Sequence, residues 1–341
     1  MKTIAMCALL AALAFGLLPG NRDEAAAPDE GLVLLVETQQ DAQAPQKASS
    51  ARQNQSEKAA VQTAPDAQTV RLLDGGAVTE LSMEDYLTGV LLSEMPADFE
   101  PEARKAQAVA ARTFTRRKLL QPKHENADVC AEASCCQAWT SRERLRQKYG
   151  DSFEAVWSAA REAVRQTAGQ VLTYDGQLID AVYFSCSGGA TEAAVAVWGT
   201  DVPYLQAVES PGEEAAPRFS SRAVFSPEEF SQRLMQENPD VQLSGSPDAW
   251  LGETTRSAGG GAATCSIGGV SFSGTQLRRM FGLNSTRLTL SYQDGDFVFD
   301  VTGFGHRVGM SQYGAQTMAR LGFSYQTILQ YYYQGAEVER Q

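Results

Sequence analysis

Residues 82–96, SMEDYLTGVLLSEMP, predict a helix that ends at an acidic side chain. Ser82 and Asp85 have the spacing of a capping box, in which each side chain binds an otherwise unpaired backbone N–H group. Pro96 ends the helix, because a proline disfavours helical geometry at the residue before it. One face of this helix is apolar, with steps of three and four residues between its members, Met83, Leu87, Val90 and Leu91. Glu94 follows next on the same face.

The position of Glu94 has two interpretations. A carboxylate that packs against apolar neighbours loses hydration, which raises its pKa and suits it to act as a general acid at neutral pH. Alternatively, the helix end frays and Glu94 turns outward into water. The spacing alone leaves both interpretations open.

The next helix, residues 101–120, adds two cations. Pro101 stands at its start, where the missing N–H group costs nothing, and small side chains define a narrow packing face, Ala103, Ala106, Ala110 and Phe114. Lys105 and Arg112 are seven residues apart, nearly two turns, and therefore share a second face. They either line a groove beside Glu94 or form a solvated basic face.

The composition indicates a globular protein. The chain has 341 residues, 43% of them hydrophobic, which is enough to bury a sizeable core. The net charge is −12, and the sequence has no basic stripe of the kind that binds phosphate backbones. We therefore expect no nucleic-acid partner.

The N-terminal segment predicts export. An apolar run from Ile4 to Leu18 is typical of a signal peptide or a membrane anchor, and we assign it to residues 1–20. Residues 21–68 are predicted to be a flexible linker, since their stretch rich in Gln, Ala and Ser cannot bury enough apolar surface to fold. The folded domain is predicted to span residues 69–341, outside the cell membrane, either anchored to it or secreted to the wall.

A cluster of soft ligands lies between the second helix and the next predicted element. Within thirteen residues the chain carries His124, Cys130, Cys135 and Cys136. Four such ligands can form a closed, tetrahedral zinc site that stabilises a loop with little core of its own. Disulfides are the alternative, because an exported protein meets an oxidising environment. The sequence also leaves open whether Cys186 and Cys265 pair or remain buried thiols.

A glycine-rich block follows the last predicted long strand. Residues 303–319, GFGHRVGMSQYGAQTMA, lead into a helix that Ser311 can cap. The glycine spacing does not match a dinucleotide fingerprint, and no lysine follows as in a P-loop. A nucleotide-binding role is therefore not expected.

Three blocks of this sequence resemble the signature blocks of the stage II sporulation protein D family, which also includes amidase-enhancer proteins. They are EDYLTGVLLSEMP (84–96), PEARKAQAVAARTF (101–114) and the glycine-rich block (303–319). Three intermediate pieces are also similar, YFSCSGGAT (183–191), VWGTDVPYL (197–205) and FSGTQLRRMFGLNST (272–286). The resemblance extends over about residues 69–338.

The resemblance implies a lytic transglycosylase that cleaves the bond between N-acetylmuramic acid and N-acetylglucosamine in peptide-stripped glycan strands. In such a family Glu94, within the Glu-Met-Pro motif, is the catalytic acid. The product is an anhydromuramic end, because the C6 hydroxyl of the sugar closes the ring, so one glutamate serves both proton transfers. The expected setting is septal wall remodelling and engulfment during sporulation.

The resemblance also implies substrate contacts. Lys105 and Arg112 are expected to position glycan oxygens or to tune Glu94, and further candidates are His306, Gln312, Tyr204 and Ser187. The familiar form of the last block has a glycine where this chain has Arg307, so the backbone of the loop and the role of His306 are less secure here. Some family members carry zinc on a mixture of histidine and cysteine in the segment that here contains residues 124–136, which favours a structural zinc ion.

The fold expected is α+β, with two lobes around a substrate groove. The expected partners are glycan strands, an amidase that strips peptides, and a membrane protein of the engulfment machinery, and the N-terminus is a candidate for membrane association. The alternative function is a non-catalytic wall-binding enhancer of a partner amidase.

Overall fold

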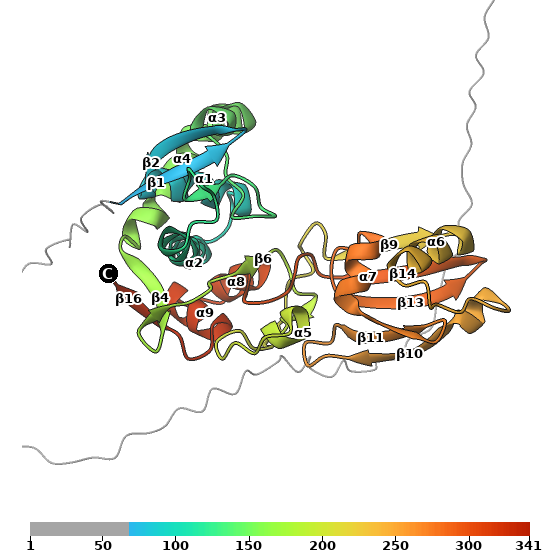
Figure 1. Cartoon of the computed structure of the whole chain (residues 1–341). Coiled ribbons are helices and arrows are strands. Elements are labelled where there is room, and N and C mark those ends of the chain that lie inside the picture. The colour runs from blue at the N-terminus through green and yellow to red at the C-terminus, as the bar shows by residue number, and fades with distance from the viewer. Residues whose placement is uncertain (1–67) are drawn as a thin grey trace, which may run out of the picture. The chain divides into compact units, whose positions relative to one another are not determined.

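The computed structural model describes residues 68–341 (Figure 1). The predicted signal or anchor segment, and all of the predicted linker except Gln68, lie outside the described residues. Within the described part, no helix is long and apolar enough to cross a membrane.

The domain begins with a β-hairpin that leads directly into the predicted first helix. Strands β1 (Thr69–Asp74) and β2 (Ala77–Ser82) are antiparallel, and the short β3 (Val129–Cys130) runs parallel to β1. Helix α1 spans Met83–Glu94, and the Ser82 hydroxyl accepts the N–H of Asp85 at 3.1 Å. The predicted capping box is only half formed, because the Asp85 carboxylate accepts the Ser82 hydroxyl instead of a backbone N–H.

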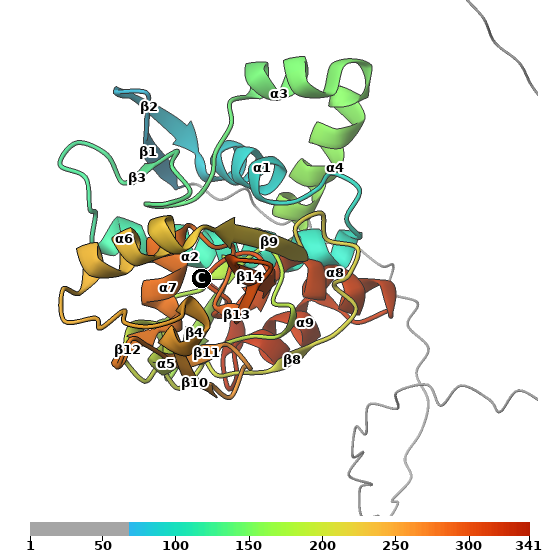
Figure 2. The ribbon, with the colours of Figure 1, turned by 90° about the vertical axis from the view of Figure 1, so that its right-hand side faces the viewer.

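A bundle of helices surrounds the first hydrophobic core. Its members are α1, α2 (Pro101–Leu120), α3 (Arg142–Tyr149), α4 (Phe153–Gln166), α8 (Gln312–Arg320) and α9 (Tyr325–Tyr332), with the 3-10 turn Gly150–Ser152 before α4. Figure 2 shows α4 beside α1, and the two helices are in contact. The alanines of α2 are fully buried, as their narrow face predicts, and allow close approach of the neighbouring helices.

Small sheets complete this part of the domain. One contains β16 (Glu337–Arg340), β4 (Gln170–Tyr174) and β5 (Gln177–Leu178), and another pairs β15 (Met310–Ser311) with β6 (Tyr183–Phe184) in parallel. The remaining short elements are β7 (Gly189–Ala190), α5 (Ala194–Trp198) and β8 (Glu209–Ser210). Ser324 caps α9 by accepting the N–H of Thr327.

A separate second core is rich in aromatic side chains. Two antiparallel sheets contribute to it, one of β9 (Ser220–Phe225), β14 (Asp296–Thr302) and β13 (Arg287–Gln293), and one of β10 (Leu251–Arg256), β11 (Ala262–Ile267) and β12 (Val270–Ser273). The other contributions come from the 3-10 turn Pro247–Trp250 and from helices α6 (Pro227–Glu237) and α7 (Gly274–Phe281). Figure 1 shows α6 and α7 beside the β9–β14–β13 sheet. At its centre Phe230 stacks on Phe297, with ring centroids 3.8 Å apart.

Helices and small, mainly antiparallel sheets make the fold mixed, consistent with the expected α+β class. The two hydrophobic cores are distinct clusters. The finer expectation of two lobes around a groove stays a prediction.

Candidate active site

Glu94 lies at the end of α1 and lines a cavity of about 450 Å³. Its Oε1 accepts the backbone N–H of Ala138 at 2.7 Å. The interpretation in which Glu94 turns outward into open water is therefore wrong, because the carboxylate is half-buried and held by the chain that follows the cysteine cluster. The lining residues, besides Glu94, are Ser93, Phe114, Ala133, Cys136, Gln137, Ala138, Val182, Tyr183, Phe184, Ser185, Phe304, Gly305, His306 and Gln312.

The surroundings of Glu94 favour its protonated form. Burial raises the pKa of the Glu94 carboxyl above its ordinary value, while the Ala138 N–H and the Gln312 side chain oppose this rise. The larger effect is burial. Glu94 therefore has the electrostatic setting expected of a general acid.

Gln312 faces Glu94 from the start of α8. The side chain is 4% exposed, and the preceding residue, Ser311, caps the helix by accepting the N–H of Gly314 at 3.1 Å. The amide nitrogen of Gln312 makes no hydrogen bond of standard geometry within residues 68–341, although the amide lies near enough to affect the Glu94 pKa. A buried donor without a firm partner at a cavity wall is suited to bind a ligand oxygen.

A hydrogen-bonded network supports the loop that holds Glu94. The Tyr183 hydroxyl donates to Gln137 Oε1 at 2.7 Å, and Gln137 Nε2 donates to the hydroxyls of Tyr86 at 3.1 Å and Thr115 at 2.9 Å. Burial and the charge of Glu94 raise the pKa of Tyr183, which keeps the phenol neutral. Sequence reasoning missed this network, because its members come from four distant segments.

Gly89 in the middle of α1 also positions this loop. A Cβ atom at residue 89 would overlap the indole ring of Trp139, so glycine permits the loop to pack directly on the helix. One turn later, the Ser93 hydroxyl donates to Thr140 Oγ1 at 2.9 Å. The loop is thus fixed on both sides of the Ala138 N–H group.

His306 also lines the cavity. Its Nδ1 accepts the N–H of Val308 at 3.1 Å, and its ring packs 5.6 Å from Phe184 and 5.5 Å from Trp198, measured between centroids. Burial, and secondarily the charge of Arg278, lowers the pKa of His306 to about 4. The imidazole is therefore neutral at pH 7, and the Val308 contact places its proton on Nε2.

Arg307 stabilises the loop instead of disturbing it. The φ angle of Arg307 is 67°, which lies in the left-handed region. Glycine adopts this region readily, whereas any other residue adopts it at some cost in strain. The guanidinium is fully buried and donates to Glu192 Oε1 at 3.0 Å and to the carbonyls of Ser187 at 2.8 Å and Gly259 at 2.6 Å. The bulk and charge of Arg307 therefore do not disturb the loop, because buried hydrogen-bond partners surround the guanidinium.

Lys105 and Arg112 do not line the cavity. Arg112 is fully buried and donates to the Val164 carbonyl at 3.0 Å, and Lys105 pairs with Glu102 and lies over the Tyr325 ring, 5.1 Å from its centroid. The prediction that these two cations lie beside Glu94 is therefore wrong. Seven-residue spacing gives the two a common face, but that face packs on α4 and α9.

Ser187 and Tyr204 also lie away from Glu94. Ser187 is buried, and both its N–H and its hydroxyl donate to Glu213 Oε2, at 2.6 and 2.7 Å. The Tyr204 hydroxyl accepts the N–H of Asp180 at 3.1 Å. The structure thus brings together Glu94, Gln312 and His306 among the predicted residues, and gives Ser187 and Tyr204 contacts that hold the fold.

Glu213 is a buried residue that the sequence analysis did not identify. The carboxylate is 1% exposed and accepts hydrogen bonds from Ser187, Gly188, Ser210 and Ser311. Because Ser311 caps α8, Glu213 holds the segment that presents Gln312 to the cavity. No pattern in the sequence distinguishes this glutamate from the solvated Glu214 beside it.

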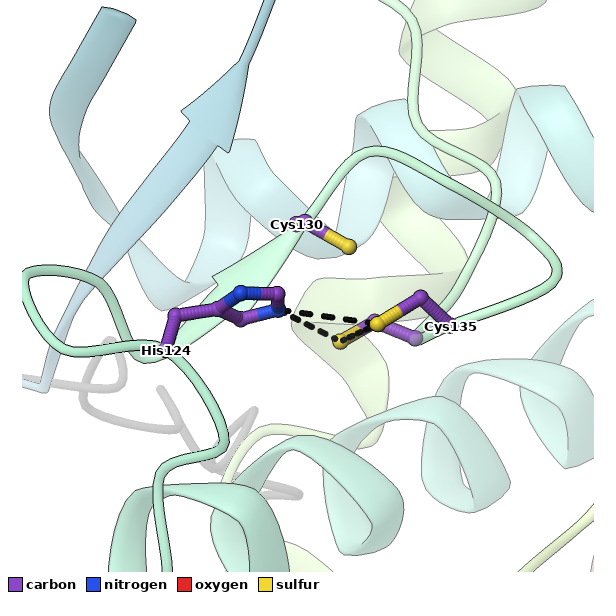
Figure 3. A group of neighbouring side chains, drawn as sticks. His124, Cys130 and Cys135 are labelled. Carbon is purple, nitrogen blue, oxygen red and sulfur yellow. Dashed lines mark hydrogen bonds between the residues drawn. The ribbon is translucent and has the colours of Figure 1, made fainter. Parts of the chain in front are cut away.

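The four predicted metal ligands converge (Figure 3). His124 Nε2 lies 3.7 Å from the Sγ atoms of Cys135 and Cys136, which are 4.0 Å apart, and all four ligand atoms, that of Cys130 included, lie within 4.8 Å of one another. Zinc–sulfur bonds of about 2.3 Å in a tetrahedron place sulfur atoms about 3.8 Å apart, so the cluster fits such an ion. The distances between the ligand atoms are thus close to those that a bound metal requires.

The cysteines of the described residues form no disulfides. Cys186 and Cys265 are buried thiols, and Cys265 belongs to the second core. The cluster also adjoins the cavity, because Cys136 lines it and lies two residues before Ala138.

Comparison with known proteins identifies the family. Residues 74–174 match the family model described as SpoIID, Stage II sporulation protein. The chain is 36% identical over 300 residues to the Stage II sporulation protein D of Bacillus subtilis, covering 83% of this chain and 85% of the relative. It is also 36% identical over 266 residues to that of Bacillus amyloliquefaciens, covering 77% and 75%.

An amidase enhancer of Bacillus subtilis is more distant, with 30% identity over 301 residues, 73% of this chain and 39% of the relative. The chain belongs to the stage II sporulation protein D family, as its signature blocks predict.

Proposed function

We propose that this protein is a lytic transglycosylase that cleaves peptidoglycan glycan strands with Glu94 as its single acid and base. The observation that carries the proposal is the cavity around Glu94. Of the described residues that line it, only Glu94 has a carboxyl group. Glycoside hydrolases of the usual kind need a second carboxylate for water or for the covalent intermediate.

The proton moves twice in this mechanism. Protonated Glu94 donates to the oxygen that links C1 of N-acetylmuramic acid to C4 of N-acetylglucosamine, and the C1–O bond breaks. The C6 hydroxyl of the muramic acid then attacks C1 and gives its proton to the Glu94 carboxylate. The acid is regenerated, no water is consumed, and the products are a free C4 hydroxyl and a 1,6-anhydro ring.

Neighbouring groups support these steps. The Ala138 N–H stabilises the Glu94 carboxylate after its first proton transfer, because a hydrogen bond to the charged form favours that form. The Gln312 amide and neutral His306 would bind sugar hydroxyl and acetamido groups, which their position in the cavity lining supports. Neither residue needs to change its charge during the reaction.

The test is product analysis on peptide-stripped glycan. We expect anhydromuramic ends from the wild-type protein, and a loss of rate of at least about 100-fold in Glu94→Gln, the magnitude typical of a general acid. Glu100→Gln is a matched control, since Glu100 precedes α2 and lies outside the cavity. Anhydro products from Glu94→Gln at the wild-type rate, or reducing ends from the wild type, contradict the mechanism.

A structural zinc ion is part of the proposal. His124, Cys130, Cys135 and Cys136 would hold it with four protein ligands, which leave no position for a reactive water. Its contribution would be to hold the loop that leads to Gln137 and Ala138.

The second candidate function is that of a non-catalytic enhancer of an amidase. The 30% identity to a protein named as an amidase enhancer favours it. If glycan yields no products but the protein accelerates an added amidase in a Glu94-independent manner, this function replaces the first.

The cellular setting follows from the family. We propose wall remodelling during engulfment, beside an amidase and a membrane protein of the engulfment machinery, on the outer face of the membrane. Membrane fractionation of the full-length chain, compared with a chain that begins at residue 21, tests the location.

A further inference from the structure

A second cavity continues from the one that contains Glu94. It has a volume of about 650 Å³ and shares two wall residues, Phe304 and His306, with the first. The Arg218 guanidinium lies 4.8 Å from the centroid of the Phe304 ring, and His306 accepts the N–H of Val308. The two cavities therefore adjoin at Phe304 and His306.

Trp198 supplies an aromatic surface there. It is the last residue of α5, which ends because Gly199 adopts a left-handed conformation with φ of 75°. The indole is 47% exposed, although it packs on His306 on one side. The electron-rich face of an indole attracts the polarised C–H groups of a sugar ring, so an exposed tryptophan at a cavity wall suits a saccharide.

Arg278 supplies a positive charge in the lining of the same cavity. Its Nε donates to the Leu283 carbonyl at 3.3 Å, and it forms no ion pair with any carboxylate of residues 68–341. Burial lowers the pKa of Arg278, and its charge reaches His306, whose pKa it also lowers. A half-buried guanidinium without a counter-ion favours a ligand that brings a carboxylate. The adjacent Arg279 differs, because it pairs with Glu237.

We propose that this cavity is a second saccharide subsite, in which Trp198 stacks on a sugar ring of the strand and Arg278 binds a carboxylate that this sugar carries. The inference rests on the proposed function for the identity of the polymer. A muramic acid whose peptide has been removed carries a free lactyl carboxylate, whereas a muramic acid with its peptide has an amide there. Arg278 would thus make the protein selective for stripped strands.

The test measures binding by calorimetry in the Glu94→Gln protein, where no substrate is consumed. Two probes of equal length are compared, a peptide-stripped glycan oligosaccharide with lactyl carboxylates and an uncharged N-acetylglucosamine oligomer. We expect Trp198→Ala to weaken both probes by about tenfold, as for the loss of an aromatic contact. Arg278→Gln should weaken only the carboxylate-bearing probe, by about 10- to 100-fold.

Two variants serve as controls. Trp198→Phe should retain most of the affinity, and Arg320→Gln makes the same change in charge at an exposed residue outside both cavities. Unfolding curves of each variant identify any that fail to fold. Unchanged affinity in Trp198→Ala, equal losses for both probes in Arg278→Gln, or no binding of either probe to the Glu94→Gln protein overturns the inference.

This outcome is separable from that of the proposed function. Cleavage by the wild type with unchanged binding in the Trp198 and Arg278 variants refutes the subsite alone. Absence of anhydro products, together with the expected binding losses, refutes the transglycosylase and leaves a glycan-binding site.

Discussion

Glu94 combines two opposing influences at a single carboxyl group. Burial makes its charge costly, and the Ala138 N–H makes the charge tolerable once it forms. A group that must give up a proton and take one back benefits from both. The half-buried position at a helix end, with one backbone donor, achieves this without a neighbouring cation from residues 68–341.

The pH dependence of activity should report Glu94. Because the acid must be protonated, we expect the rate to fall as pH rises through the raised pKa of Glu94. His306→Gln should keep this alkaline limb, since a histidine with a pKa of about 4 is neutral from about pH 5 to pH 9. Loss of the limb in His306→Gln would assign it to the histidine.

The free energy of unfolding should also depend on pH through Glu94, because the buried carboxylate is destabilising once it is charged. A carboxyl whose pKa is raised on folding contributes stability below its unfolded pKa and loses it as pH rises through the folded pKa. Glu94→Gln stays neutral, so its free energy of unfolding should increase relative to that of the wild type as pH rises. Urea unfolding at several pH values measures this, and a difference independent of pH contradicts it.

At the scale of the element, the first turn of α8 connects the fold to the cavity. Ser311 caps the helix, accepts the N–H of Gly314 and donates to Glu213, and the next residue is Gln312. Glu213 in turn holds the segment around Ser187. One buried carboxylate therefore organises two loops that are distant in sequence.

A matched pair of caps tests this connection. Ser311→Ala and Ser324→Ala each remove a helix N-cap, at α8 and α9 respectively, and loss of the cap should cost about 1 kcal/mol in each. Ser311→Ala should cost more than this, because it also removes a donor from the buried Glu213 carboxylate. Only Ser311→Ala should also reduce glycan cleavage, because α9 does not reach the cavity. Equal activity of the two variants, measured at a temperature where both are folded, would contradict the link.

The cysteine loop is the second element with a direct connection to Glu94. We expect one equivalent of zinc in purified protein, with loss of thermal stability and activity on chelation, because Cys136 precedes the Gln137–Ala138 segment. Cys135→Ser should lower the metal content, whereas Cys265→Ala, in the second core, should retain it. Elemental analysis that finds no metal in the wild type would remove the zinc proposal.

At the scale of the whole described domain, Arg307 connects segments of the chain that lie next to the two hydrophobic cores. It binds Ser187 and Glu192 on one side, and Gly259 and Thr286 on the other. Gly261 also donates to Glu192, and a Cβ atom at residue 261 would overlap its carboxylate. The glycine-rich segment at 256–264 is thus closely packed around an ion pair.

Removal of Arg307 should be costly. Arg307→Met leaves Glu192 buried without its counter-ion, and we expect a loss of about 3–5 kcal/mol in the free energy of unfolding. The double variant with Glu192→Gln should recover part of the loss, because residue 192 then carries no unpaired buried charge. A double variant no more stable than the single one would indicate that the Arg307 contacts to carbonyls dominate.

Local signals in the sequence predicted much of this domain and of its site. The helix that ends at Glu94, the caps at Ser82 and Ser311, and the cysteine cluster depend on neighbours within a few residues. Lys105 and Arg112 were misplaced because which helix face is buried depends on partners far along the chain. Ala138 was missed for a different reason: a backbone N–H group has no signature in the residue type.

Gly89 sets a limit on how this domain can change. Alanine in place of a glycine within a helix ordinarily adds about 0.5–1 kcal/mol of stability. In α1 the added methyl group would occupy the space of the Trp139 indole, and the displaced loop would withdraw the Ala138 N–H from Glu94. A more stable variant of this domain must therefore keep Gly89, since the glycine lowers the stability of the helix but lets the loop pack against it.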